Sequence, residues 1–281
     1  MTTLIPIEHP TRNRHGVIVR RGPALGEASP LAGRSHESFE DALQALALGG
    51  AAPPSVDFAR FGLEATRGTT SIRSQVLLES AESAVSVLRS ALLRGDRAFK
   101  LKIRARADAD VLLELRTLAP SILLRVDANR AFAHERDVPW DVLARAGVEW
   151  IEEPCVNAGS LAGTPVPIAL DESVLDDPAR ALEDLGDGRA SALVLKPTIL
   201  GASATLELGH ACQRLGGRAI ISHAFESEIG RLACEEIARR VDPAETHGLA
   251  RWDGIDDYRV VASRLGVRSL IESFDVHSVL G

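Results

Sequence analysis

The feature of this sequence that most constrains its fold is a regular alternation of strand-like and helix-like segments from about residue 74 onward. Short aliphatic runs, the last of them weaker, are expected to form strands at residues 74–80, 98–103, 122–129, 148–154, 167–173, 192–198, 219–225 and 247–250. Helical patterns lie between them, at residues 81–95, 108–120, 139–147, 176–186, 204–217 and 227–241. Such alternation predicts parallel strands joined by crossover helices.

Two architectures satisfy this alternation, an open doubly wound sheet and a closed barrel. Eight units within roughly 180 residues match a compact (β/α) barrel. No Gly-rich phosphate loop follows the first expected strand, which weakens the nucleotide-binding alternative. We therefore predict an α/β protein whose residues 71–254 form a (β/α)7β-type TIM barrel.

The first 70 residues follow a different pattern. Residues 15–31 are typical of a short hairpin and a loop, and residues 35–50 and 53–68 each have the start and stop signals of a helix. We expect residues 1–70 to form a small α+β domain ahead of the barrel. The segment 255–281 has no strong pattern and is expected to pack back on this domain.

Composition narrows the class of partners. The 281 residues are 45% apolar and carry a formal net charge of −7 without a basic stripe, so nucleic acid is not expected as a partner. No membrane span or secretion signal is evident. The three cysteines are few, odd in number and widely spaced, which is typical of reduced thiols. These features predict a cytoplasmic protein that does not bind membranes, and they leave its oligomeric state open.

The run 98–103, AFKLKI, places two lysines within one expected strand. Lys100 and Lys102 share a face, because side chains two positions apart in a strand point the same way. In a barrel the helices cover the outer face of the strands, so neither face of this strand is open to solvent along its length. Lysine is rarely buried without a partner, so the two ammonium groups need acidic neighbours.

Acidic neighbours are available at the ends of the next expected strands. Taken singly, each of these charges could be a solvated strand end or a helix cap. In a barrel, however, the C-terminal ends of the strands converge on one site, and we interpret the set as functional. Its members, in strand order after the two lysines, are Asp127, Glu152 with Glu153, Asp171 with Glu172, and Lys196.

This set of residue types favours one kind of chemistry. Three carboxylates on neighbouring strands suit a hard dication such as Mg²⁺, whereas the absence of clustered His or Cys argues against zinc. A dication bound to a substrate carboxylate acidifies its α-carbon, because it stabilises the enediolate. A neutral lysine can then remove the α-proton. We hypothesise that Lys100 makes the neutral form of Lys102 easier to reach, because like charges disfavour each other.

The residues resemble the signature of the enolase superfamily, in its muconate-lactonizing-type branch. That signature is carried here by Lys100, Lys102, Asp127, Glu152, Asp171 and Lys196. Further segments resemble the o-succinylbenzoate synthase family, namely GEASPLAG, PSVDFARFGLEA, LLRVDANRAF, IEEPC, ALDES, VLKPTILG and ISHAFESEIG. The resemblance implies a magnesium-dependent lyase of menaquinone biosynthesis, with a barrel and an N-terminal capping domain.

The resemblance also implies a reaction and the residues that perform it. Members of the family dehydrate 2-succinyl-6-hydroxy-2,4-cyclohexadiene-1-carboxylate to o-succinylbenzoate, by syn elimination through an enediolate. Asp127, Glu152 and Asp171 would hold Mg²⁺, for which Mn²⁺ could substitute. Lys102 would remove the α-proton and then protonate the departing hydroxide. Lys196 would stabilise the enediolate from the other side of the ring.

Other residues have supporting parts in the resemblance. Lys100 would tune the site, and Asn129 and Glu172 would support the metal ligands. Arg125 is two residues before Asp127 and is expected on the inward face near the substrate. Ser222 is a candidate contact for the succinyl end of the substrate.

The chain departs from the family pattern in two places. Its N-terminal domain is short, so the closure of the cap over the site is expected to differ. His223 stands in a turn where relatives often carry serines. It is either a substrate contact or an ordinary strand-end histidine.

Two alternatives stay open at this point. Two-lysine relatives racemise N-succinylamino acids or epimerise related substrates, and the motif set does not separate these activities from the synthase, although KPTILG favours the synthase. The second alternative is a non-catalytic barrel that binds a metal or a partner. The presence of the whole charged set argues against it.

Overall fold

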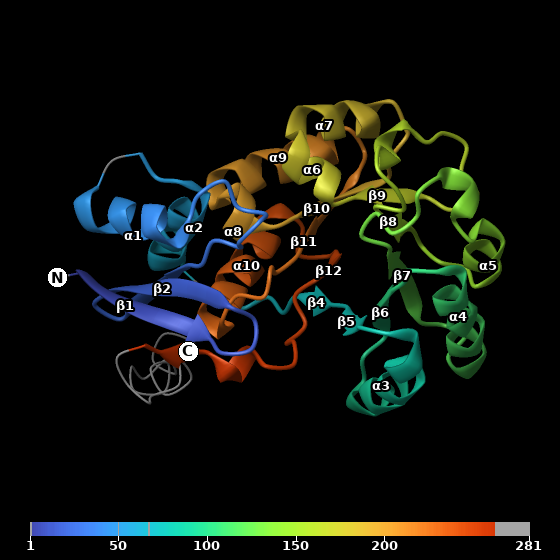
Figure 1. Cartoon of the computed structure of the whole chain (residues 1–281), viewed down its shortest axis with the longest axis horizontal. Helices are drawn as coiled ribbons and strands as arrows, with labels where there is room; N and C mark the ends of the chain where they lie inside the picture. The colour runs from blue at the N-terminus through green and yellow to red at the C-terminus, as the bar shows by residue number, and fades with distance from the viewer. Residues whose placement is uncertain (1, 50, 67, 262–281) are drawn as a thin grey trace.

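A curled parallel sheet is the centre of the fold (Figure 1). The structure is a computed structural model that describes residues 2–49, 51–66 and 68–261. The sheet has the strand order β11-β10-β9-β8-β7-β6-β5 and all its paired neighbours are parallel. Its strands are β5 (Val76–Leu78), β6 (Ala98–Lys102), β7 (Leu123–Asp127), β8 (Ile151–Glu152), β9 (Ile168–Leu170), β10 (Ala192–Leu195) and β11 (Arg218–Ile221). The predicted α/β class with parallel strands is confirmed.

A short eighth strand connects the two edges of this sheet. β12 (Thr246–His247) pairs in parallel with β4 (Arg73–Ser74), which runs directly into β5. On its other side, Gly248 forms a parallel bridge with Ser222, just after β11, and its N–H donates to the carbonyl of Ile221. The weak strand expected at residues 247–250 is therefore present, one residue earlier than predicted, and it brings the first and last strands together.

Helices lie between most successive strands, as the alternation predicts, whereas β8 and β9 are joined through the short 3-10 helix Ala158–Ser160. The α-helices of this part are α3 (Ala81–Arg94), α4 (Arg106–Leu118), α5 (Trp140–Arg145), α6 (Glu172–Asp176), α7 (Pro178–Gly186), α8 (Pro197–Leu200), α9 (Ala202–Arg214) and α10 (Glu228–Val241). α3 is capped at both ends: the Ser80 side chain accepts from the N–H of Ser83, and Gly95 closes the helix in the left-handed conformation. The helix predicted over 176–186 is α7, which begins at Pro178 after the Asp177 cap. α6 is an additional short helix, and it occupies residues expected at the end of the strand 167–173.

The N-terminal residues form a second, antiparallel sheet with the order β13-β1-β2-β3. Its strands are β1 (Thr2–His9), β2 (Arg14–Arg21), β3 (Ala24–Ala28) and β13 (Arg259–Val260), and it is accompanied by α1 (Phe39–Leu48) and α2 (Pro54–Glu64). β1 is an addition to the predicted hairpin. β13 pairs with β1, so the start of the expected returning segment lies against this sheet, while residues 262–281 are outside the described residues.

Close packing joins the antiparallel sheet to the parallel one through α2. This helix packs on β3 and on α8, α9 and α10 of the larger unit. Gly26 permits the contact with β3, because a Cβ at this position would lie 2.0 Å from the carbonyl oxygen of Ala59. The large core extends through the parallel sheet and its helices, and a smaller cluster around Ile7, Ile18 and Tyr258 lies beside it.

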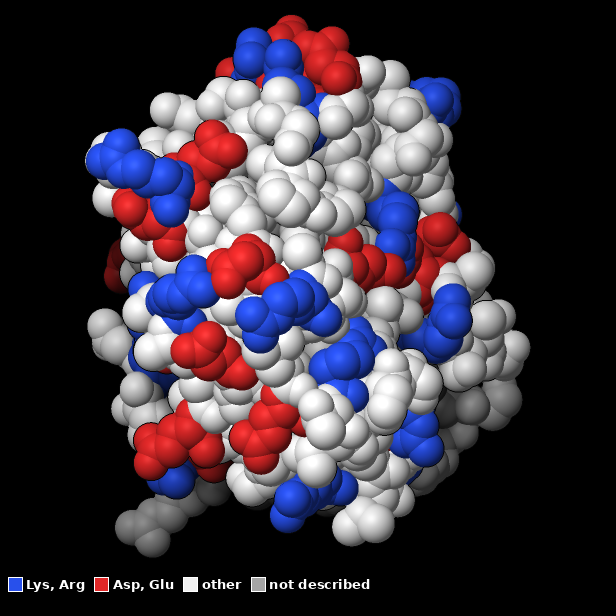
Figure 2. All heavy atoms as spheres, turned by 90° about the vertical axis from the view of Figure 1, so that its right-hand side faces the viewer, with Lys and Arg blue, Asp and Glu red and all other residues white. Residues whose placement is uncertain are grey.

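The outer face around α4 and α5 is covered with mixed charges (Figure 2). Arg106 of α4 and Asp141 of α5 form an exposed bidentate pair, with N–O distances of 2.9 and 2.6 Å. None of the helices in the described part of the chain is long and apolar enough to cross a membrane.

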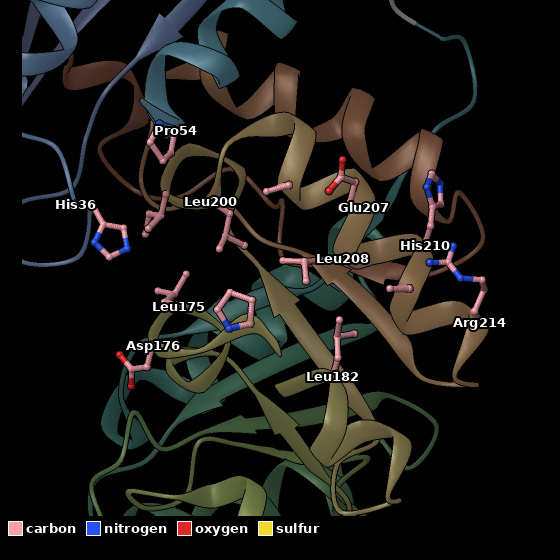
Figure 3. Close-up of a pocket in the computed structure, with 14 residues that line it drawn as sticks. His36, Pro54, Leu175, Asp176, Leu182, Leu200, Glu207, Leu208, His210 and Arg214 are labelled. Carbon is pink, nitrogen blue, oxygen red and sulfur yellow. The ribbon is translucent and has the colours of Figure 1, made fainter. Parts of the chain in front are cut away.

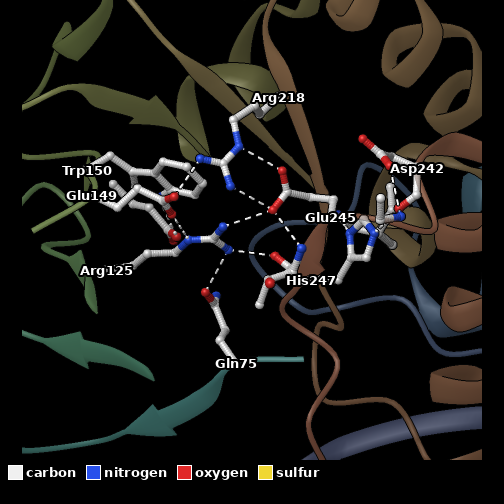
Figure 4. Close-up of polar contacts among 12 residues, drawn as sticks. Gln75, Arg125, Glu149, Trp150, Arg218, Asp242, Glu245 and His247 are labelled. Carbon is white, nitrogen blue, oxygen red and sulfur yellow. Dashed lines mark hydrogen bonds and ion pairs between the residues drawn. The ribbon is translucent and has the colours of Figure 1, made fainter. Parts of the chain in front are cut away.

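A network of charges centred on the buried Arg125 lies inside the parallel sheet, beneath the ends of the strands (Figure 4). Arg125 donates to Glu149, Gln75 and Glu245, at 2.6, 2.9 and 3.0 Å, and to the carbonyl of Thr246. Arg218 bonds the same two glutamates, and the two guanidiniums lie over the ring of Trp150, 3.9 and 4.5 Å from its centroid. The network therefore ties β7 to the segments before β5 and around β12.

This network predicts a large effect of the Arg125→Leu substitution. Arg125 is fully buried, so its loss leaves carboxylates inside the protein with only part of their compensation. We expect the free energy of unfolding, measured by urea denaturation, to fall by roughly 3 kcal/mol. The control is Arg106→Leu, which removes an equally well-formed but exposed pair and should change stability little. Equal effects of the two substitutions would contradict a structural role for Arg125.

Candidate active site

The ionisable residues predicted at the strand ends lie at one level of the parallel sheet. In the pairing register, Lys102 of β6 is opposite Asp127 of β7, and Asp127 is opposite Glu152 of β8. Asp171 directly follows β9, and Lys196 directly follows β10. Because parallel strands all end on the same side, five consecutive strands deliver their charges to one place.

Direct ion pairs join the members of this set. The Nζ of Lys100 is 2.6 Å from Oε2 of Glu152 and 3.2 Å from Oδ2 of Asp127. The Nζ of Lys196 is 2.6 Å from Oδ2 of Asp171. The three acids are buried, and the two lysines are nearly so. The structure thus brings the predicted acids and lysines together.

A cavity of about 800 Å³ opens above these residues. Of the predicted residues, those that line it are Lys100, Lys102, Asp127, Asn129, Asp171, Glu172, Lys196, Ser222 and His223. Glu152 lies beneath the floor and has no exposed surface. Lys102 is the more exposed of the two β6 lysines, and its Nζ is 3.4 Å from Oε2 of Glu79. Lys100 and Lys102 therefore face the same cavity, as their spacing predicts.

The two adjacent glutamates, Glu152 and Glu153, have different environments. Glu152 contacts Lys100 inside the sheet. Glu153 instead accepts hydrogen bonds from the backbone N–H groups of Asp171 and Ser173, at 3.0 and 2.7 Å, and pairs with Arg130. Glu153 therefore holds the chain that follows β9, and only Glu152 lies among the strand-end lysines.

Asn129 contacts two acids of the floor, whereas Ser222 lines the cavity without a hydrogen bond to any of these acids. The amide of Asn129 donates to Oε1 of Glu172 at 3.2 Å, and its backbone N–H donates to Oδ1 of Asp127. Asn129 holds a positive φ of 42°, a conformation that asparagine adopts more readily than most residues. Ser222 lines the cavity, and its hydroxyl donates to the carbonyl of His223 at 3.3 Å.

Arg125 is a predicted site residue that the structure brings neither to the cavity nor into contact with the acids and lysines of its floor. Its backbone position is on the inward face, as expected, but its side chain points into the lower network and is saturated there (Figure 4). A substrate contact does not fit this position. The spacing of two residues from Asp127 correctly predicted the face of the sheet. It did not predict the depth, because the side chain of Arg125 lies below the level of Asp127.

The sequence reasoning missed the residues that other elements contribute to the cavity. Arg34, from the loop after β3, donates to Oε1 of Glu172 at 3.2 Å. Arg12, Phe225 and Trp252 also line the cavity. Arg34 lies just after the GEASPLAG segment, but no local pattern distinguishes it from an ordinary surface arginine.

Burial and mutual repulsion raise the pKa values of some of the acids at the floor of the cavity. Burial raises the pKa of Glu152 to about 7, with Asp127 and Asp171 adding to the rise and Lys100 opposing it. Burial also raises the pKa of Glu172, with a further contribution from Asp171. For Asp127, burial is outweighed by Lys100 and Lys196, which hold its pKa below the ordinary value. A further positive charge at the floor would therefore stabilise the ionised acids.

The donor set fits a hard cation on two observations. Oδ1 of Asp171 and Oε2 of Glu172 are buried and have no hydrogen-bond partner, so they have free lone pairs. The side-chain atoms at the floor that could ligate a metal ion are carboxylate oxygens, which Mg²⁺ prefers. Among residues 2–49, 51–66 and 68–261, no three acidic, His or Cys side chains are already arranged as ligands of one ion. Here Lys100 and Lys196 hold the acids in ion pairs.

A second cavity of about 780 Å³ lies beside the first and shares Leu175 and Ile199 with it (Figure 3). Its wall is formed by apolar side chains such as Leu182 and Leu208, with His36 and His210 near its ends. It contains none of the strand-end acids or lysines. The first cavity is therefore the candidate active site.

Comparison with known proteins identifies the family. The family model described as "Enolase C-terminal domain-like" matches residues 82–268. The chain therefore belongs to the Enolase C-terminal domain-like family, and it is an enzyme of the enolase superfamily. The alternative of a non-catalytic barrel is thereby set aside.

Particular relatives carry two different activities. The o-succinylbenzoate synthase of Citrobacter koseri is 29% identical over 271 residues, which cover 85% of this chain and 83% of that protein. The crystal structure of o-succinylbenzoate synthase from Thermosynechococcus elongatus, complexed with Mg in the active site, matches with a TM-score of 0.69 at 20% identity and covers 98% of both chains. The dipeptide epimerase from Methylococcus capsulatus, complexed with Mg ion, matches with a TM-score of 0.70 at 21% identity and covers 95% of this chain and 97% of that one. The two structures show the fold that this chain shares.

The environment of His223 predicts that its ring stays neutral at physiological pH. Burial and the nearby cations Lys100, Arg231 and Lys196 lower the pKa of His223 to about 3, and its Nδ1 accepts the N–H of Phe225. The folded protein should therefore show no titration of this imidazole by NMR between pH 5 and 8. The urea-unfolded chain is the reference, where the same ring should titrate near pH 6.5. A midpoint near 6.5 in the folded protein would contradict this environment.

Proposed function

We propose that this enzyme is an o-succinylbenzoate synthase, a carbon–oxygen lyase that dehydrates 2-succinyl-6-hydroxy-2,4-cyclohexadiene-1-carboxylate to o-succinylbenzoate. One observation carries the proposal: Lys102 and Lys196 line the same cavity, from β6 and from the end of β10, with the acids of the intervening strands between them. The Citrobacter koseri relative, similar over 85% of the chain, supports the particular reaction. The reaction would belong to menaquinone biosynthesis in the cytoplasm, with a small carboxylate as substrate.

A divalent metal is part of the proposal. Asp127, Glu152 and Asp171 would hold Mg²⁺, or Mn²⁺ in its place, and the unpartnered Oδ1 of Asp171 supports this. When bound, the cation would supply positive charge that stabilises the enediolate form of the substrate carboxylate. The Thermosynechococcus elongatus enzyme, with Mg in its active site, supports the choice of metal.

The chain's own lysines would move the proton. Neutral Lys102 would take the proton from the carbon α to the carboxylate, and the electron pair would enter the enediolate. Collapse of the enediolate would expel hydroxide from the neighbouring carbon, and the ammonium of Lys102 would return its proton to form water. Lys196 would remain charged and stabilise the negative charge from the opposite side. Lys100, held by Glu152 and Asp127, would keep its charge beside Lys102.

We also propose a division of labour between the two sheets. Residues 1–70, joined by the tail that begins at 255, would act as a shortened capping domain, and residues 71–254 would act as a (β/α)7β barrel that carries the catalytic groups. The contact of Arg34 with Glu172 supports this, because it links the N-terminal segment to the floor of the cavity. Asn129 and Glu172 would support the ligands, and Ser222 would contact the succinyl end.

A racemase or epimerase is the second candidate, because two lysines on opposite sides of one cavity could exchange an α-proton on either face. The similarity in fold to a dipeptide epimerase supports it. Incubation in D₂O with N-succinylamino acids separates the candidates. The synthase proposal predicts dehydration at least about tenfold faster than α-deuterium exchange in these compounds. Exchange as fast as dehydration would favour the racemase.

The lysine pair gives the test of the proposed reaction. Lys102→Ala should lower kcat of dehydration by about 10²-fold to 10⁴-fold, because the base is lost. Lys196→Ala should lower kcat by about 10²-fold to 10³-fold while Mg²⁺ affinity is kept, because an electrostatic contact is lost. Turnover is followed by formation of the aromatic product. Full activity of Lys102→Ala, or loss of metal affinity alone in Lys196→Ala, would contradict these roles.

The proposed metal site predicts the behaviour of Asp171→Asn. Loss of one charged ligand should weaken Mg²⁺ binding, measured by isothermal titration calorimetry, by more than about tenfold. Asp187→Asn is the matched control, because Asp187 ends α7 on the surface, and it should leave the affinity unchanged. Equal affinity of Asp171→Asn and the wild type would exclude Asp171 as a ligand.

A further inference from the structure

Arg12 extends from the turn between β1 and β2 to the cavity that holds the proposed active site. This turn belongs to the antiparallel N-terminal sheet, whereas the lysines and acids of the floor belong to the parallel sheet. Arg12 is itself exposed and lines the cavity together with Phe225 and Trp252. A cation from a separate part of the fold is thus held above the charged floor.

Two aromatic rings fix the position of the guanidinium. Its central carbon lies 4.2 Å from the ring centroid of Phe225 and 4.7 Å from that of Trp252. The two rings are perpendicular, with their centroids 5.5 Å apart, and so they contact the guanidinium from two sides. Contacts of this kind position a cation through its flat face and leave its N–H donors free at the edge.

Other arginines of the cavity already have polar partners, and Arg12 has none among the described residues. Arg34 donates to Glu172, and Arg251 pairs with Glu228 and Asp256. Glu79, an acid of the same cavity, pairs with Lys102. In residues 2–49, 51–66 and 68–261, no hydrogen bond or ion pair involves the guanidinium of Arg12. Its donors are therefore available to a ligand in the cavity.

Phe225 links this cation to the proposed base. The Nζ of Lys102 lies 5.8 Å from the centroid of the same ring that Arg12 covers, so the two cations are at most about 10 Å apart. Phe225 holds an unusual φ of 63°, and its carbonyl accepts the hydroxyl of Tyr258 at 2.8 Å. A bulky residue in this conformation must be held by its surroundings, which is typical of a functional position.

We propose that Arg12, held between Phe225 and Trp252, binds the second carboxylate of a dicarboxylate substrate, the one remote from the reacting carbon. The position of the first carboxylate, at the strand-end acids, rests on the function proposed above. The guanidinium edge suits a carboxylate because its paired N–H groups match the two oxygens. The cavity would then select dianionic ligands, with one anion at the floor and one at Arg12.

The test compares two ligands that differ only in the remote carboxylate. o-Succinylbenzoate and 2-butyrylbenzoate have the same ring, first carboxylate and chain length, but the second ligand ends in a methyl group. Binding to the wild type and to Arg12→Ala is measured by calorimetry in the presence of Mg²⁺. Arg136→Ala is the matched control, because Arg136 is an exposed arginine on the short helix Glu135–Asp137 outside the cavity.

The wild type should bind o-succinylbenzoate about tenfold to a hundredfold more tightly than 2-butyrylbenzoate, which is the range expected for a charge-assisted contact. Arg12→Ala should bind the two ligands equally, and its affinity for 2-butyrylbenzoate should equal that of the wild type. Arg136→Ala should keep the preference for o-succinylbenzoate. A preference that persists in Arg12→Ala overturns the assignment.

The same comparison with N-succinylphenylalanine and N-butyrylphenylalanine separates this proposal from the proposed function. If the wild type binds only the amino acid pair, and Arg12→Ala removes the preference for the succinyl compound, the synthase assignment fails and the role of Arg12 stands. If the wild type prefers neither dicarboxylate, the role of Arg12 is overturned.

Discussion

The structure depends on the burial of acidic groups beside lysines at the ends of parallel strands. Asp127, Glu152 and Asp171 are almost entirely removed from solvent, and burial of a carboxylate is costly unless a positive charge lies close by. Lys100 and Lys196 provide that charge at 2.6 Å. The two amines do not neutralise the site completely, since the pKa of Glu152 is still raised to about 7. This remaining excess of acid is the physical reason why the floor suits a cation.

A second layer of charge lies below the first and has a different task. Arg125 and Arg218 bind Glu149 and Glu245 around Trp150, and they draw together the strands at the two edges of the curled sheet (Figure 4). The indole N–H of Trp150 is directed at Oε1 of Glu152, 3.5 Å away, so the lower layer also contacts an acid of the upper one. The lower layer, centred on Arg125 and Arg218, connects the strands to one another. The catalytic roles that we propose belong to the acids and lysines of the upper layer.

The sequence predicted the parts of this arrangement that depend on local patterns. Strand–helix alternation predicted the parallel sheet, and the helical pattern at residues 81–95 predicted α3 almost to its exact limits. The alternating pleat put Lys100 and Lys102 on one face, and the common direction of the strands gathered Asp127, Glu152, Asp171 and Lys196. Contacts between distant segments were not predictable in this way. The side chain of Arg125 is held by Glu245, 120 positions away, and such partners leave no periodic signal.

The N-terminal contribution to the cavity was the least predictable part. Arg12 is positioned by rings more than 200 positions later in the chain, and Arg34 by an acid 138 positions later. The pairing of β13 with β1 is equally remote in sequence. Each of these contacts joins segments that are distant in sequence, and α2 packs between the elements of the two sheets. The local sequence around Arg12 or Arg34 therefore resembles any polar turn.

Diffraction from crystals grown with Mn²⁺, recorded to exploit the anomalous signal of the metal, tests the central claim most directly. The account predicts one anomalous peak at the cavity floor, bonded to Asp127, Glu152 and Asp171, with Lys102 and Lys196 on its two sides. A peak elsewhere, or a floor without metal in which Lys100 and Lys196 keep their present ion pairs at saturating Mn²⁺, would contradict it.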